Sequence, residues 1–159
     1  HEKELRAGFT TLATTKMRFE IIDRDGLHII NDAYNASPAS MRAAIKTTAE
    51  IAKGRKIAVL GDMFELGTNS DAYHRQVGNY INELRLNDGS HVLDYLITIG
   101  DYSKEIDAAA RNSTDIKCIH FDKKEDSIEY LKALLAPGDV VTLKASNGMK
   151  FSEIVSEIE

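Results

Sequence analysis

Two polar segments of this sequence carry side chains that could bind a ligand, and each directly follows an apolar run. Residues 32–38 read D-A-Y-N-A-S-P, and residues 61–67 read G-D-M-F-E-L-G. Open α/β sheets bind ligands at polar turns of this kind, because the carboxyl ends of strands meet the amino ends of helices there. A third polar stretch, 144–148, follows another apolar run. These three segments form the candidate site.

Helix capping and turn formation are the competing interpretation, since Asp, Asn, Ser and Gly are the residues that caps and turns need. We favour this interpretation for Asp101 and Asp122, which follow two further apolar runs. The segments 32–35 and 61–67 are too long and specific for capping alone. His74 falls inside a predicted helix, where a surface or hydrogen-bonded histidine is more common than a ligand.

Several familiar sites are missing from the sequence. It holds no G-x-x-x-x-G-K-[ST] loop for nucleotide phosphates and no G-x-G-x-x-G after the first strand. Cysteine pairs and close histidine spacing are absent too, so no metal site is predicted. A Ser-His-Asp triad cannot be argued from spacing, because triads are assembled in space.

Composition indicates an ordinary globular domain. The 159 residues are 43% apolar and 28% charged, with a formal net charge of −5, which argues against a nucleic-acid-binding protein. The single cysteine, Cys118, lies in an apolar stretch and is predicted to be a buried, inert thiol, which fits a reducing, cytoplasmic setting. No apolar stretch approaches the ~20 residues that cross a membrane, and no signal peptide is expected. Because residue 1 is not methionine, we expect processing or a longer parent chain.

Hydrophobic periodicity predicts an N-terminal β-hairpin followed by alternating helices and strands. The hairpin pairs 17–23 with 27–30 through an Asp-Gly turn, and Ser37 and Pro38 mark the start of a helix. Further strands are predicted at 56–61, 95–100, 117–121 and 140–144. Helices are predicted at about 70–86, capped by Ser70 or Asp71, then at 103–111, at 126–135 and from about 149.

This order predicts an α/β fold with a mostly parallel sheet and helices on both faces. In such a sheet the carboxyl ends of the parallel strands share one edge, so the polar segments should converge there. Residues 1–16 do not fit the alternation and look like a helix end and a linker.

The polar segments resemble the Mur ligase family. The string from Asp32 to Met41 is similar to D-x-Y-N-A-N-P-x-S-M of the branch that adds D-alanyl-D-alanine to UDP-N-acetylmuramoyl-tripeptide. The segment 61–67, followed by H-x-x-V-G from His74, resembles that branch's G-D-M-x-E-L-G and H-x-x-V-G. Residues 144–149 resemble its K-G-S-x-G-M loop, and Arg18 resembles the arginine that opens the third domain.

The resemblance implies a fragment of a three-domain, ATP-dependent ligase of peptidoglycan precursor synthesis. Residues 17–159 would be its Rossmann-like third domain, a three-layer sandwich that closes over ATP and receives the dipeptide, and residues 1–16 the end of the central domain and the hinge. Its partners would be the N-terminal and central domains of the same monomeric ligase. The central domain would supply the P-loop and most of the contacts to Mg²⁺, so this chain alone would be inactive and would contribute no catalytic residue.

The resemblance also assigns roles to residues. ATP would be bound by Arg18, Asp32, Tyr34 and Asn35. D-alanyl-D-alanine would be bound by Lys144, Ser146 and Asn147, with Asp62 and Glu65 in a possible site loop. In the implied reaction a substrate carboxylate takes the γ-phosphoryl group of ATP, and the dipeptide amine attacks the resulting acyl phosphate.

The sequence departs from the family pattern at three positions. Ala145 stands where glycine is usual, Asn147 where a basic residue is common, and Ser37 where asparagine is usual. Two alternatives remain: another amino-acid ligase of the family, and a non-catalytic doubly wound binding domain. Asn35 and the G-D-M string at Gly61 favour the D-alanyl-D-alanine branch, and a P-loop encoded upstream would distinguish an enzyme from a binding domain.

Overall fold

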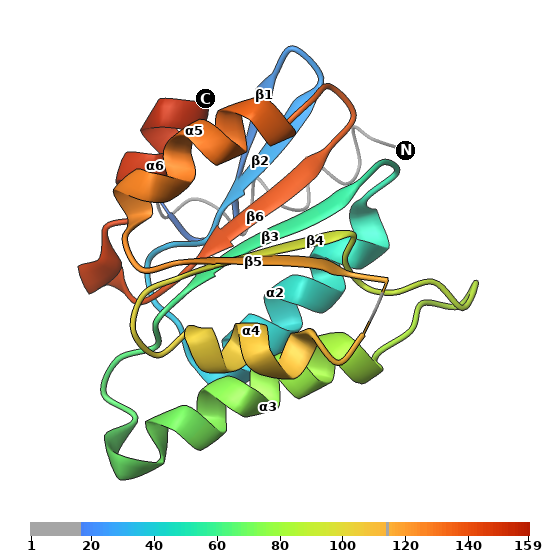
Figure 1. Cartoon of the computed structure of the whole chain (residues 1–159). Coiled ribbons are helices and arrows are strands. Elements are labelled where there is room, and N and C mark those ends of the chain that lie inside the picture. Colours follow the sequence, from blue (N-terminus) through green and yellow to red (C-terminus); the bar gives the residue numbers. More distant parts are fainter. Residues whose placement is uncertain (1–16, 114) are drawn as a thin grey trace.

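The computed structural model describes residues 17–113 and 115–159 and shows a twisted sheet between two layers of helices (Figure 1). The six strands lie in the order β1-β2-β6-β3-β4-β5. β1 pairs antiparallel with β2, and every other pairing is parallel. The predicted α/β three-layer sandwich with an N-terminal hairpin is therefore confirmed. The proposed hinge, residues 1–16, lies outside the described residues.

The elements follow the predicted alternation. The strands are β1 (Glu20–Arg24), β2 (Leu27–Asn31), β3 (Lys56–Gly61), β4 (Tyr95–Ile99), β5 (Lys117–Phe121) and β6 (Val140–Lys144). The helices are α2 (Pro38–Ile51), α3 (Ser70–Glu83), α4 (Lys104–Ala110), α5 (Lys124–Leu134) and α6 (Ser152–Ile158). The hairpin turns at Asp25 and Gly26, which have φ angles of 49° and 88°. Positive φ at both central residues is what a two-residue type I′ hairpin turn needs.

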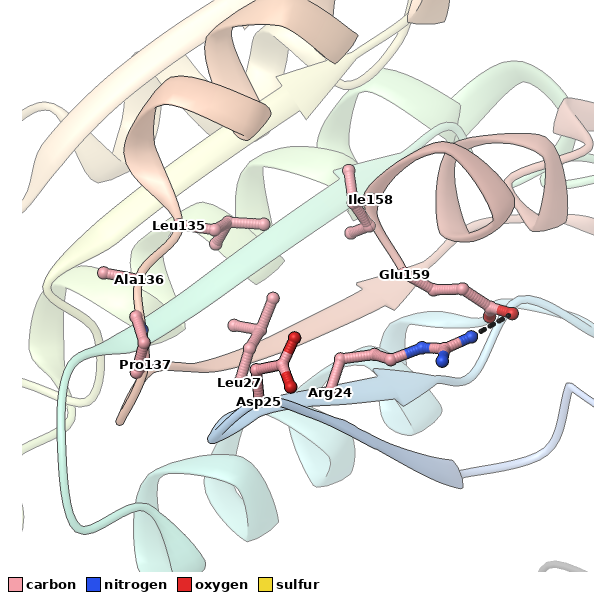
Figure 2. Close-up of a pocket in the computed structure, with 8 residues that line it drawn as sticks. All are labelled: Arg24, Asp25, Leu27, Leu135, Ala136, Pro137, Ile158 and Glu159. Atoms are coloured by element: carbon pink, nitrogen blue, oxygen red, sulfur yellow. Dashed lines mark ion pairs between the residues drawn. The ribbon is translucent and has the colours of Figure 1, made fainter.

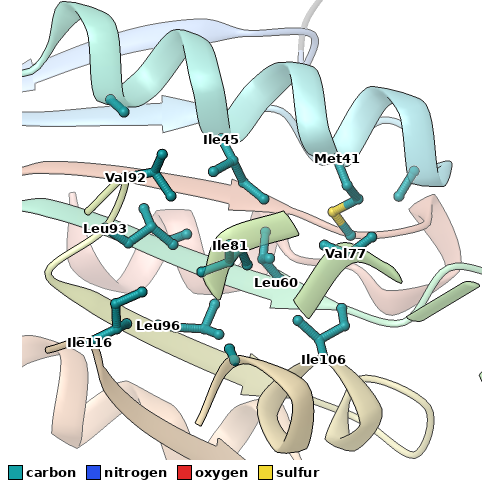
Figure 3. Packing of buried hydrophobic residues seen from close by; sticks show 14 of the residues in the cluster. Met41, Ile45, Leu60, Val77, Ile81, Val92, Leu93, Leu96, Ile106 and Ile116 are labelled. Carbon is teal, nitrogen blue, oxygen red and sulfur yellow. The ribbon is translucent and has the colours of Figure 1, made fainter. Parts of the chain in front are cut away.

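The two helical layers bury separate apolar clusters against the sheet. Helices α2, α3 and α4 cover one face, where Met41, Ile45, Val77, Ile81 and Ile106 pack on the sheet (Figure 3). Helices α5 and α6 cover the other face. Since both faces are covered, the central strands are nearly continuous apolar runs, as parallel sheets require. Cys118 on β5 is half-buried, and burial raises the pKa of its thiol to about 11.

The ends of the helices differ from their predicted positions more than the ends of the strands do. Helix α2 is capped as expected, with Ser37 Oγ accepting from the backbone N–H of Ser40 at 3.1 Å. The predicted cap of α3 at Ser70 or Asp71 is wrong, because a 3₁₀ turn, Gly67–Asn69, leads into the helix and Asn69 takes the cap position. A second 3₁₀ turn, Asn147–Met149, precedes α6, which therefore begins at Ser152 instead of about 149.

Candidate functional site

The polar segments follow β2, β6, β3 and β4, four adjacent parallel strands, so their loops line the carboxyl edge of the sheet. Hydrogen bonds join each of these loops to the next along the sheet. The sequence predicted that the segments would converge at this edge, and the structure places them there.

The loop after β2 is joined to the end of β6 by a buried lysine. Lys144 Nζ lies 2.9 Å from Asp32 Oδ2 and 2.9 Å from the carbonyl oxygen of Asn35. The two charged side chains are 5% and 15% exposed, respectively. A charge-assisted hydrogen bond in such a sheltered place is stronger than one in water. Lys144 therefore fixes the backbone and the carboxylate of this loop.

The same loop holds the segment that leads into β1. The backbone N–H of Phe19 donates to Asp32 Oδ1 at 3.1 Å, and the N–H of Tyr34 donates to the carbonyl of Met17 at 3.0 Å. Met17 and Phe19 both have positive φ, 69° and 48°, which side-chain-bearing residues adopt only with support. These contacts bring Arg18 to the candidate site.

Arg18 and Tyr34 form an exposed pair at this end of the site. The guanidinium carbon of Arg18 lies 4.1 Å from the centroid of the Tyr34 ring, within the range of a cation–π interaction. Both side chains are exposed, and Tyr34 retains 41% of its surface. An aromatic face beside a cation suits a ligand that combines a ring with phosphates.

The loop after β6 is joined to the loop after β3. Ser146 Oγ accepts from the backbone N–H of Phe64 at 2.7 Å, and the N–H of Ser146 donates to the carbonyl of Asp62 at 3.0 Å. The Phe64 ring lies over Gly148, where a Cβ would be 2.8 Å from the ring. Gly148 therefore allows the close approach of these two loops.

Asp62 joins the loop after β3 to the start of α4. One carboxylate oxygen accepts from the N–H groups of Tyr102 and Ser103, at 3.0 and 2.8 Å, and the other from Asp101 at 3.0 Å. The Asp62 residue is 4% exposed. Three backbone donors around one buried carboxylate indicate a structural role, in which Asp62 fixes the loop after β4.

His74, on helix α3, supports the loop after β3. It is fully buried, and its Nε2 accepts from the backbone N–H of Met63 at 3.0 Å, which fixes the tautomer so that Nδ1–H donates to the carbonyl of Ser70 at 2.7 Å. Its ring stacks on Tyr102, with centroids 5.6 Å apart. Of the two expected environments, at the surface or hydrogen-bonded in the interior, His74 has the second.

Other predicted side chains have few or different contacts. Glu65, Asn147 and the Asn35 side chain are exposed, and Glu65 has a φ of 62°. Asp101 and Asp122 were expected to cap helices or form turns. Neither is a cap, since the cap positions of α4 and α5 are Ser103 and Lys123, without side-chain hydrogen bonds, but both lie in the turns that join a strand to the next helix. No sequence pattern pointed to Phe64 and Tyr102, which are 39% and 43% exposed. The available signal was their place three residues beyond the ends of β3 and β4.

One open pocket lies away from this site. It has a volume of about 480 Å³, and Figure 2 shows its lining residues around the hairpin turn and the end of α6. Arg24 and Glu159 form an ion pair of 3.5 Å at its rim. The hairpin turn and the residues before β6 belong to the amino edge of the parallel strands. None of the predicted site residues lines this pocket.

The described residues hold neither a metal-binding cluster nor a membrane-spanning helix. Across 17–113 and 115–159, no three His, Cys, Asp or Glu side chains are grouped so that they could hold a metal ion. Within the same ranges, no helix has the length and apolar character to cross a bilayer.

The fold and the arrangement of the edge agree with a known class of domain. Residues 17–147 match the family described as Mur ligase, glutamate ligase domain, and the chain belongs to this family.

Two relatives with similar sequences share one name within this family. The chain is 38% identical over 154 residues to the UDP-N-acetylmuramoyl-tripeptide–D-alanyl-D-alanine ligase of Bacillus subtilis, covering 95% of this chain and 32% of the relative. It is 31% identical over 158 residues to the ligase of the same name from Escherichia coli, covering 98% and 32%. The chain thus spans about a third of the length of these relatives, as expected for a fragment.

Two solved structures with a similar fold are also ligases of this kind, named MurF. A MurF ligase from Thermotoga maritima, in complex with ADP, superposes with a TM-score of 0.73 at 27% identity, covering 91% of this chain and 31% of that one. MurF from Acinetobacter baumannii gives a TM-score of 0.76 at 28% identity, covering 91% and 30%.

Proposed function

We propose that this chain is the C-terminal domain of a cytoplasmic, ATP-dependent ligase that adds D-alanyl-D-alanine to UDP-N-acetylmuramoyl-tripeptide. The observation that carries the proposal is similarity along nearly the whole chain to ligases of this name. The intact ligase would be a monomer that acts through an acyl phosphate. Its N-terminal and central domains would bind the UDP-linked substrate and the ATP phosphates and would supply most of the contacts to Mg²⁺.

The nucleotide would meet this domain at the end of β2. Arg18 and Tyr34 offer a cation and an aromatic face, both exposed, and Asp32 lies between them and Lys144. Arg18 would pair with phosphate or ribose oxygens, and Asp32 would accept from ribose hydroxyls or orient Arg18. Each Asp32 oxygen already accepts one hydrogen bond and can accept a second. Asn35 would contribute its exposed amide.

The dipeptide would meet the loop after β6. Asn147 is exposed at its tip, while Ser146 holds the neighbouring loop through Phe64. The role of Lys144 at the dipeptide carboxylate stays a prediction, and its contacts with Asp32 and Asn35 favour a different role. Asp62 and Glu65 would shape this side, Asp62 by holding backbone and Glu65 from an exposed turn. Closure of the domain would exclude water from the acyl phosphate.

The test uses the intact ligase that carries this chain. Purified protein should release phosphate from ATP and form the ligated product when UDP-N-acetylmuramoyl-tripeptide and D-alanyl-D-alanine are both present. Replacing the dipeptide by single amino acids tests the alternative of another amino-acid ligase. Absence of ATP turnover with every acceptor would favour a non-catalytic binding domain.

Residue roles are tested in the same assay. Asp32→Ala and Asn35→Ala should each raise the KM for ATP much more than the KM for UDP-N-acetylmuramoyl-tripeptide, because both residues lie in the loop that would face the nucleotide. Equal effects on the two constants, or no effect on either, would assign these residues a purely structural role.

A further inference from the structure

We propose that Lys144 is a positioning residue for the nucleotide-binding loop and does not bind the carboxylate of the dipeptide. The inference rests on the proposed function, since it assigns Lys144 to one of the two sides of that site. It differs from what the sequence predicts for this residue, and it follows from where the ammonium group lies.

The ammonium group of Lys144 is fully engaged by the loop after β2. Besides Asp32 Oδ2 and the Asn35 carbonyl, each at 2.9 Å, it lies 3.5 Å from the carbonyl of Asp32. An ammonium has three N–H donors, so these three acceptors, all among the described residues, account for every one. With its side chain 5% exposed, Lys144 faces the loop and not solvent.

The effect of Lys144 extends through Asp32 to the exposed pair. Asp32 uses its other oxygen to hold the N–H of Phe19, whose φ of 48° is costly for a side-chain-bearing residue. Arg18 directly precedes Phe19 and stacks on Tyr34. Lys144 therefore orients Asp32, and Asp32 in turn holds the backbone that aims Arg18.

Removing the cation would leave the Asp32 carboxylate without its counter-charge in a sheltered position. Loss of one partner from a buried ion pair is destabilising in general, so lower stability alone would not distinguish positioning from simple packing. The decisive readout is which substrate constant changes. Loss of a dipeptide-binding lysine would raise the KM for D-alanyl-D-alanine. Loss of a positioning lysine would instead raise the KM for ATP and weaken ADP binding.

The experiment uses Lys144→Met in the intact ligase, which keeps the aliphatic stem. We expect the KM for ATP and the dissociation constant for ADP, measured by calorimetry, to rise by about 10- to 100-fold, the range for one charge-assisted hydrogen bond to nucleotide that a misplaced Arg18 or Asp32 would lose. The KM for D-alanyl-D-alanine should change by less than about threefold, the size of an ordinary surface substitution.

Arg55→Met is the matched control. Arg55 also pairs with a buried carboxylate, Asp139, at 2.7 Å and donates to a backbone carbonyl, that of Leu134, but at the opposite edge of the sheet. It should lower stability and leave ADP binding unchanged. A comparable loss of ADP affinity in both variants would show that Lys144 acts only through stability.

A second pair of variants covers the case in which Lys144→Met fails to fold. Adding Lys144→Met to Asp32→Asn removes both charges, and it should weaken ADP binding by less than about threefold beyond Asp32→Asn alone, because Lys144 acts through Asp32.

A rise in the dipeptide KM, in either background, with ADP affinity unchanged would overturn the proposal. A wild-type ligase that binds ADP but does not use D-alanyl-D-alanine would overturn the proposed function alone, since ADP calorimetry would still test Lys144. A wild-type protein that binds no ADP would overturn both.

Discussion

Asp62 offers a sharp test of how the edge of the sheet is held together. Its carboxylate accepts three backbone N–H groups from residues 101–103, and Ser103 is fully buried. Residues Asp101 and Tyr102 are exposed, so water can replace the carboxylate at their N–H groups. The N–H of Ser103 has no such replacement. The cost of losing the carboxylate is therefore dominated by this one donor and by the lost charge.

The magnitude follows from these contacts. A hydrogen bond to a charged group contributes about 1.5–3 kcal/mol, and an unsatisfied buried donor costs about 1–3 kcal/mol. Because the three bonds share one carboxylate, their values are not summed, and we expect Asp62→Ala to lower the free energy of unfolding by about 3–4 kcal/mol. Asp62→Asn keeps an oxygen for the N–H groups of Tyr102 and Ser103, which share one acceptor, and should cost about 1–2 kcal/mol.

The assay is urea unfolding of the 159-residue chain followed by far-ultraviolet circular dichroism. Asp71→Ala is the control, because Asp71 is an exposed carboxylate in the first turn of α3 and should change stability by no more than about 0.5 kcal/mol. Equal losses for Asp62→Ala and Asp62→Asn would refute the assignment of acceptors. Wild-type stability in both variants, with ligase activity lost in the intact enzyme, would show that Asp62 binds a ligand instead.

Four further predictions concern the chain itself. The isolated 159-residue chain should fold without releasing phosphate from ATP above a heat-killed control, because it lacks a P-loop; measurable release would contradict the fragment assignment. Cys118, with its pKa raised to about 11, should react with a thiol reagent at pH 8 at least ~50-fold more slowly than in urea, since the thiolate is the reactive form. Since the folded thiol keeps its proton between about pH 9 and 11 while the unfolded one loses it, stability should fall over that interval. Gly78→Ala should lower the free energy of unfolding by about 1–2 kcal/mol in urea titrations, because its Cβ would lie 2.3 Å from the Ile106 carbonyl oxygen, a clash that outweighs the better helix propensity of alanine.

Local patterns in the sequence predict the strands well. The strands at 56–61, 117–121 and 140–144 were predicted at their observed bounds, because short apolar runs bounded by polar residues have few other stable arrangements. The strand order was not predicted. Which strands become neighbours depends on packing between distant parts of the chain, and periodicity carries no information on it.

In the candidate site, too, the location could be predicted from the sequence and the long-range contacts could not. The sequence predicted that the polar segments would meet at one edge, but it could not predict how they bind one another. Lys144 and Asp32 are 112 positions apart, and a lysine at the end of a strand is compatible with solvent, ligand or ion pair. Capping or turn formation was expected of Asp101, whereas the carboxylate that accepts from this turn is Asp62, 39 positions earlier. Contacts made through space between loops leave no local pattern.

The position of β6 has a consequence for how the domain forms during synthesis. It is the last of the six strands in the chain, yet it lies between β2 and β3, so His28 pairs with Val140. Until residues 140–144 have left the ribosome, the hairpin has no partner in the sheet, and β3 exposes one edge. At roughly 5–20 residues per second, synthesis of the segment between β2 and β6 takes about 5–20 s, during which these edges are open to wrong pairing. Such long-range pairing also makes folding slow. A ribosome stalled just before Val140 should therefore hold a nascent chain that is unusually sensitive to protease.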